Sequence, residues 1–179
     1  MQRKNLIGLA LFVAAFVAFN TAVAQDVKVQ HMPGTDFTKF HTYKWTTIQG
    51  ASHPNQIEDA QIKQAVDTQL AAKGLTKTDS DTADLNVGYQ VAVDQEKQWN
   101  AYGGGAGFRF GGGMGTATSS TINIGTLGVD IYDAAAKQLV WRGAATKTLD
   151  AKASPQKRQD NITKAATKLL KNFPPPVKK

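Results

Sequence analysis

The clearest alternation of apolar and polar positions in the chain runs from Asp84 to Asp94. Apolar side chains stand at every second position, and small or polar residues separate them, as in a strand with one covered face and one wet face. The apolar set is Leu85, Val87, Tyr89, Val91 and Val93. A sheet built around this strand is therefore expected to be covered on one side only.

Apolar residues at helical spacing predict two helices, over residues 56–73 and 155–172. Asn55 can cap the first helix and Gly74 can end it. Ser154 stands at the N-cap position of the second, directly before a proline. Both helices are expected to pack through their apolar stripes.

Four further extended segments complete the pattern, at 27–32, 42–47, 121–132 and 138–149, the last two joined by a turn. Within 121–132 the apolar positions change phase, so a β-bulge is expected at Gly125. The order of elements predicts an α+β fold, a two-layer sandwich of a mostly antiparallel sheet with both helices on one face. The expected core is Ile62, Val66, Leu70, Leu85, Val87, Tyr89, Val91, Leu127, Val129, Ile131, Trp141, Ile162, Leu169 and Phe173.

The first 24 residues have the pattern of an export signal. Arg3 and Lys4 precede an apolar run that is short for a membrane span, and small residues follow it up to Ala24. We expect cleavage between Ala24 and Gln25, leaving residues 25–179 as a single periplasmic or secreted domain. The alternative is a retained membrane anchor.

Composition excludes several kinds of chemistry. The chain has 179 residues, a formal net charge of +7, three histidines and no cysteine. Without cysteine there are no disulfides, no thiolate metal site, no cysteine nucleophile and no acylated cysteine for a lipid anchor. The histidines are scattered without ligand spacing, so neither a metal nor another cofactor is expected.

A glycine-rich segment lies inside the region 97–118, which is expected to be a flexible loop between two strands. Eight glycines fall between Gly103 and Gly115, and neither a P-loop nor a dinucleotide fingerprint accompanies them. The segment is either an inert hairpin tip or a loop that orders on a partner. Its candidate partner-binding residues are Tyr102, Phe108, Arg109 and Phe110.

Positive charge is concentrated at the C-terminal end, where nine basic and two acidic residues lie between Lys147 and Lys179, including a basic tail at 174–179. On the second predicted helix, Lys164, Lys168 and Lys171 lie opposite the apolar stripe. This face is either simply solvated or a contact for an anionic polymer. No aromatic platform accompanies it, so nucleic acid is not an expected partner.

Five ordered segments together resemble the domain of unknown function 4136 family, a group of exported bacterial envelope proteins that are often lipoproteins. These segments are residues 36–45, 83–89, 125–134, 137–144 and 172–175. The resemblance implies export and an α+β fold. It brings no catalytic residues and no cofactor.

The sequence therefore favours a non-enzymatic envelope module that binds an envelope protein or an anionic polymer. Asp130 and Arg142 are expected to face each other across the 133–138 turn as a structural ion pair. The alternative is an enzyme that acts on an envelope substrate and uses Asp130 or Asp84 as its acid or base.

Overall fold

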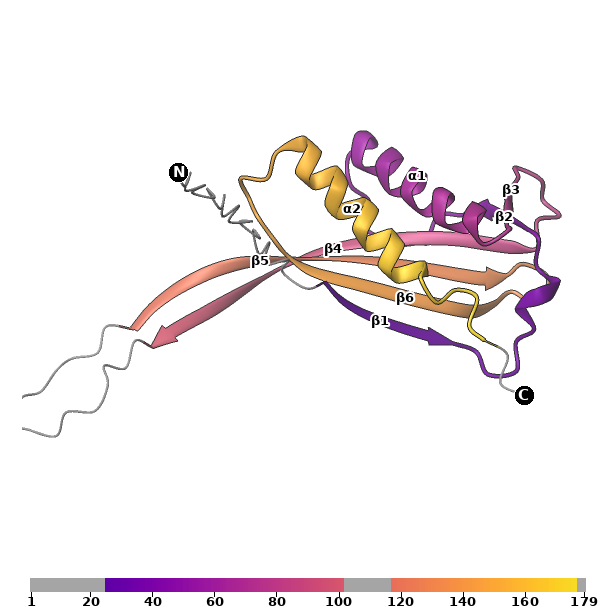
Figure 1. Ribbon diagram of the computed structural model, residues 1–179, viewed down its shortest axis with the longest axis horizontal. Coiled ribbons are helices and arrows are strands. Elements are labelled where there is room, and N and C mark those ends of the chain that lie inside the picture. Colours follow the sequence, from indigo (N-terminus) through magenta and orange to yellow (C-terminus); the bar gives the residue numbers. More distant parts are fainter. Residues whose placement is uncertain (1–24, 102–116, 177–179) are drawn as a thin grey trace, which may run out of the picture.

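The computed structural model describes residues 25–101 and 117–176, with the side chains of 98–101 and 117–118 left out. Six strands, two α-helices and one short 3-10 helix make up this part (Figure 1). In chain order they are β1 (Asp26–His31), η1 (Phe37–Lys39), β2 (Thr42–Trp45), α1 (Gln56–Ala72), β3 (Thr76–Lys77), β4 (Leu85–Ala101), β5 (Ala117–Asp133), β6 (Gln138–Leu149) and α2 (Pro155–Leu170).

The strands form one sheet in the order β1-β6-β5-β4-β2-β3. Antiparallel pairing joins β1 to β6, β6 to β5 and β5 to β4, whereas β2 is parallel to both β4 and β3. The α+β prediction is confirmed, and the sheet is mixed. The parallel part exists because α1 carries the chain back to the end of the sheet where β2 begins.

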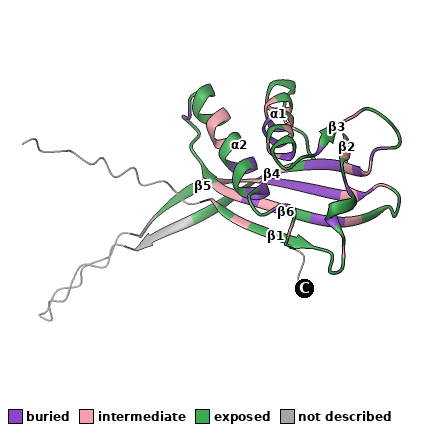
Figure 2. Ribbon diagram, turned by 45° about the vertical axis from the view of Figure 1, so that its right-hand side comes forward, coloured by how far each residue is buried: buried purple, intermediate pink, exposed green. Residues whose placement is uncertain are grey.

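Both helices pack on the same face of the sheet, as predicted (Figures 1 and 2). Of the expected core residues, Val91 and Ile162 are partly buried and pack against the core, and all the others are fully buried. The core also includes Val140, Ala145 and the aromatic residues that precede α1, namely Phe37, Phe40 and Tyr43. These aromatics come from short elements whose pattern is too brief to give a period.

The helix ends follow the residues that the sequence marks as caps. The Asn55 side chain accepts hydrogen bonds from the backbone N–H groups of Ile57 and Glu58. Ser154 accepts one from Lys157 in the same way at the start of α2. Gly74 has a φ of 86°, in the left-handed region, and α1 ends at Ala72, just before its C-cap residue Lys73.

The expected β-bulge at Gly125 is wrong. The β4–β5 ladder continues through Val93 and Gly125 without a shift, and the irregularity lies between Ile131 and Tyr132, where Val140 of β6 is the extra residue. The phase change arises because the outer part of β5 extends beyond the helices, so its apolar residues need not face them. Ile122 and Ile124 therefore keep the strand regular on the opposite phase.

The β4–β5 hairpin projects from the body of the molecule as a two-stranded arm (Figure 1). Its pairing runs from Leu85 and Asp133 to Ala101 and Ala117. Residues 97–101 and 117–118, expected as loop, are thus strand. Figure 2 shows that burial ends where the helices end and that the described part of the arm is exposed.

An aromatic cluster closes the core at the end opposite the arm. The Phe173 ring lies edge-on to Phe37 and to Trp141, with ring centroids 5.7 and 5.5 Å apart. Trp141 in turn lies over Gly143, where a Cβ atom would come within 2.5 Å of the indole. The cluster therefore ties η1, β6 and the segment after α2 together.

Candidate functional site

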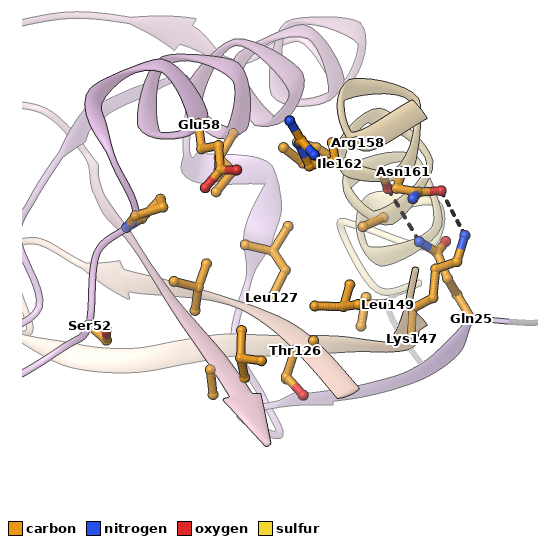
Figure 3. A pocket seen from close by; sticks show the side chains of 18 of the residues that line it. Gln25, Ser52, Glu58, Thr126, Leu127, Lys147, Leu149, Arg158, Asn161 and Ile162 are labelled. Atoms are coloured by element: carbon orange, nitrogen blue, oxygen red, sulfur yellow. Dashed lines mark hydrogen bonds between the residues drawn. The ribbon is translucent and has the colours of Figure 1, made fainter. Parts of the chain in front are cut away.

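A pocket of about 430 Å³ opens between the two helices and the sheet, at the base of the arm (Figure 3). Its walls come from the segment before α1, from α1 and α2, and from strands β4, β5 and β6. A volume of this size lies in the range of small-molecule sites. The pocket sits where α1 and α2 no longer cover the sheet completely.

The floor of the pocket is apolar. Its side chains belong to both helices and to the three central strands, and they include Ile62, Val91, Val93, Leu127, Leu149 and Ile162. Small residues keep the space open, because Gly125, Ala145 and Ala165 occupy positions where larger side chains would fill it. Hydrocarbon is therefore the chemistry that this floor accommodates best.

Lys147 brings a positive charge into this apolar surrounding. It follows Ala145 on the helix-facing side of β6, and its Nζ donates a hydrogen bond of 2.7 Å to Oδ1 of Asn161 on α2. Burial lowers the pKa of Lys147, and the nearby Lys157, Lys164 and Lys168 lower it further. The ammonium is thus held between a neutral amide and a group of like charges.

Gln25 stands beside Lys147 and Asn161 at the same end of the pocket (Figure 3). Its Nε2 donates to the backbone carbonyl of Asn161 at 3.3 Å. Its Oε1 is buried and has no hydrogen-bond partner among the described residues. A buried acceptor left unpaired costs free energy, which a ligand with a donor at this position would recover.

The mouth of the pocket carries Glu58 from α1 and Arg158 from α2 (Figure 3). Arg158 Nη1 donates to the carbonyl of Ala153 at 2.7 Å, which fixes one side of the guanidinium. In the lining that the structure describes, Glu58 is the acid that opposes Lys147 and Arg158. The site is therefore apolar at its floor and positive on balance.

Asp130 and Arg142 lie together on the opposite face of the sheet. The Arg142 Nε and Nη2 donate to the two carboxylate oxygens of Asp130, each at 2.6 Å. A shallow hollow of about 230 Å³ surrounds them and is lined by small residues and Gln90. Bonding to Asp130 raises the pKa of Arg142, so the guanidinium stays charged.

Asp84, the other candidate acid or base, is bound into the fold. Its Oδ2 accepts hydrogen bonds from the backbone N–H groups of His41 and Thr42 and from the Thr42 hydroxyl, at 2.8 to 2.9 Å. The backbone N–H groups of His41 and Thr42 and then the Thr42 hydroxyl lower the pKa of Asp84. This carboxylate anchors the start of β2 and is poorly suited to donate a proton.

The remaining candidate residues are dispersed. Lys164, Lys168 and Lys171 are exposed on or just beyond α2, and the carbonyl of Lys171 accepts a hydrogen bond from Lys73. Lys164 and Lys168 do not line the pocket, but their charges lower the pKa of Lys147, which does. The loop candidates Tyr102, Phe108, Arg109 and Phe110 lie outside the described residues.

Sequence reasoning missed the pocket and Lys147. The available signal was a lysine on the phase of β6 that also holds Trp141, Ala145 and Leu149. A charged residue on the covered face of a strand is costly unless a partner or a ligand pairs with its charge. Within residues 25–101 and 117–176, no three acidic or histidine side chains gather in a way that could hold a metal, and no helix has the length and hydropathy to cross a bilayer.

Comparison with known proteins gives a family and a fold. The model of the family described as Domain of unknown function (DUF4136) matches residues 27–175. No curated protein matches the chain.

Solved structures with a similar fold include the following two. One is a PDZ domain protein from Parabacteroides distasonis, with 16% sequence identity and a TM-score of 0.58, where the match covers 86% of this chain and 37% of that one. The chain thus spans little more than a third of that protein. The other is the PelC dodecamer from Paraburkholderia phytofirmans, with 11% identity, a TM-score of 0.50, and coverage of 82% of this chain and 95% of that one.

Proposed function

We infer that this chain, which belongs to the DUF4136 family, is a non-enzymatic binding protein of the bacterial cell envelope. The observation that carries the proposal is the pocket of about 430 Å³ at the base of the arm. It combines an apolar floor with a small number of polar groups at one end, which is the usual composition of a ligand site.

The roles of the two candidate carboxylates support binding over catalysis. Both oxygens of Asp130 bond to Arg142, and Asp84 accepts three hydrogen bonds from His41 and Thr42. A general acid or base needs an oxygen that can reach a substrate. The alternative is an enzyme that uses Asp130 or Asp84. Asp130 would have to break its bonds to Arg142 before reaction. Asp84 would depend on Oδ1, because all three of its bonds fall on Oδ2.

The envelope location rests on the N-terminal pattern. A basic start, a short apolar run and small residues before Gln25 are the features that direct a chain to export and cleavage. Cleavage there would leave the new N-terminus beside the pocket, because Gln25 lines it.

One purification tests location and binding together. The full chain is expressed in a bacterial host, the periplasmic fraction is isolated, and native mass spectrometry measures the protein with whatever has remained bound. We expect a polypeptide mass that corresponds to a start at Gln25 and a second species that carries a small molecule. A polypeptide that retains residues 1–24 in the membrane fraction would contradict the proposed location.

Variants on the arm identify the pocket as the place of binding. Val93 lines the pocket and is 63% exposed, so Val93→Trp is expected to block the pocket without disturbing the core. Gln95→Trp adds the same ring on the same side of β4, two residues further out. The bound species should disappear in Val93→Trp and persist in Gln95→Trp. Equal retention in both variants would contradict binding in the pocket.

A further inference from the structure

The polar end of the pocket holds an ammonium group whose charge is not neutralised by an ion pair among the described residues. Lys147 is half-buried, and among the described residues its ammonium donates to the neutral side chain of Asn161. Burying a charge is costly unless a counter-charge accompanies it. An anionic group placed against Lys147 would remove this cost.

Further lysines strengthen the attraction for an anion. Lys157, Lys164 and Lys168 of α2 are close enough to disfavour the charged form of Lys147. Their combined field favours a negative group at the Lys147 end of the pocket and disfavours a cation there. Glu58 stands on α1, on the other side of the mouth (Figure 3).

Gln25 adds a second requirement at the same end. The bond from its Nε2 to the carbonyl of Asn161 orients the side-chain amide, and its buried Oε1, which can only accept, is left without a donor among the described residues. A ligand that fits this end therefore carries an N–H or O–H donor next to its anionic group. The apolar floor beyond it, with Leu127 and Ile162, fits a hydrocarbon chain.

We propose that the pocket binds an amphipathic anion with one hydrocarbon chain, whose anionic group contacts Lys147 and whose adjacent donor bonds to Gln25. This inference rests on the proposed binding function and names the class of its ligand. The chemistry is shared by acylated amino acids and by single-chain lipids with a hydroxyl group beside a phosphate. A cation or a simple alcohol with a hydrocarbon chain of the same length lacks the anionic group that would contact Lys147.

The test uses N-dodecanoylglycine, which has a carboxylate, an adjacent amide N–H and a chain. Isothermal titration calorimetry on the exported protein that starts at Gln25, below the critical micelle concentration, compares it with dodecanoate, dodecanol and dodecyltrimethylammonium. N-Dodecanoylglycine should bind about 2- to 10-fold more tightly than dodecanoate, since it adds one hydrogen bond to a buried acceptor. Each methylene removed from the hydrocarbon chain of the ligand should weaken binding about fourfold, as long as the remaining methylenes still contact the apolar floor.

Variants separate the two recognition elements. Lys147→Met should weaken the affinity for both anions about tenfold or more and leave the affinity for dodecanol unchanged. Lys147→Arg should bind the anions almost as tightly as the parent. Gln25→Leu should abolish only the advantage of N-dodecanoylglycine over dodecanoate. Lys28→Met removes an exposed lysine of β1 and should change nothing. Thermal unfolding of each variant excludes loss of the fold as the cause.

The outcomes distinguish the ligand class from the function. Tighter binding of dodecanol or of the cation, abolished by Val93→Trp, would overturn the anion proposal and leave the pocket as a binding site. Unchanged affinity of both anions for Lys147→Met would also overturn it. If no amphiphile binds and the molecule that co-purifies is retained by Val93→Trp, both the proposal and the proposed function are wrong.

Discussion

Arg142 holds Asp130 by two parallel hydrogen bonds of 2.6 Å across the β5–β6 ladder, on the sheet face opposite the helices. The two side chains differ in their surroundings. Asp130 is 1% exposed, whereas 48% of the Arg142 side chain remains accessible. The two halves of this pair should therefore respond differently to removal.

We expect Arg142→Met to cost more stability than Asp130→Ala. The first change leaves a buried carboxylate without its partner, and the loss should approach about 2 kcal/mol, below the value for a fully buried pair because Arg142 is half exposed. The second leaves a guanidinium that can turn to water, at about 1 kcal/mol. Urea unfolding of both variants measures the difference. Equal losses would show that the pair contributes little beyond packing.

Asp84 should make stability depend on acidity. Its hydrogen bonds lower its pKa below the ordinary value of 3.8, so the unfolded chain takes up the proton more readily than the folded one. The stabilisation is present above about pH 4 and is lost as the pH falls through the lower, folded pKa. Asp84→Asn should be less stable than the parent near neutral pH by about 1–2 kcal/mol, with a smaller difference below about pH 3.

Urea unfolding at several pH values checks this expectation, with Asp79→Asn as the control because Asp79 is an exposed carboxylate of the neighbouring loop. The control should follow the parent at every pH. An Asp84→Asn curve parallel to that of the parent would show that another carboxylate carries the dependence.

Gly143 should tolerate no side chain. A Cβ atom there would lie 2.5 Å from the Trp141 ring and 2.8 Å from Leu169, both within the packed core. Gly143→Ala is therefore expected to lose about 1–3 kcal/mol through overpacking. Gly128→Ala is the matched control, since its Cβ would meet only the flexible Gln90 side chain at 3.1 Å. Similar losses in thermal unfolding would contradict the proposed role of the Trp141 contact.

The aromatic cluster should behave as one unit. Phe173→Ala and Phe37→Ala each remove one ring from an edge-on pair and should each cost about 3–4 kcal/mol. The double variant should lose less than the sum of the two, by at least about 0.5 kcal/mol, because the second ring has already lost its partner. A double-mutant cycle by urea unfolding measures this coupling. Strict additivity would mean that the two rings pack independently.

The fold could be predicted largely because β4 and the helices have long, regular patterns. Leu85, Val87 and Tyr89 alternate without interruption, and Asn55 and Ser154 mark helix starts by a local hydrogen bond that needs no tertiary context. The parallel pairing of β2 could not be predicted, because four residues give no period and the partner of a strand is decided by where α1 returns the chain.

The candidate site was harder to predict for the same reason. The pocket exists because small side chains on several elements leave space between them. Ala145, Ala165 and Gly125 each look ordinary when the sequence is read one residue at a time. The Asp130–Arg142 pair is different, since a short turn fixes which residues of a hairpin face each other. Such a pair can be predicted from the local geometry of the hairpin, whereas a cavity depends on how elements far apart in the sequence pack together.

The strand order has a consequence for how the molecule is assembled. β1, the first strand of the described chain, pairs only with β6, so that Asp26 lies opposite Thr146. A chain delivered from its N-terminus, whether by a ribosome or through a translocation channel, cannot place β1 until residues 138–149 have emerged. Such distant pairings slow folding because the intervening chain must be ordered first. The Gln25 end of the pocket is therefore among the last parts of the protein to form.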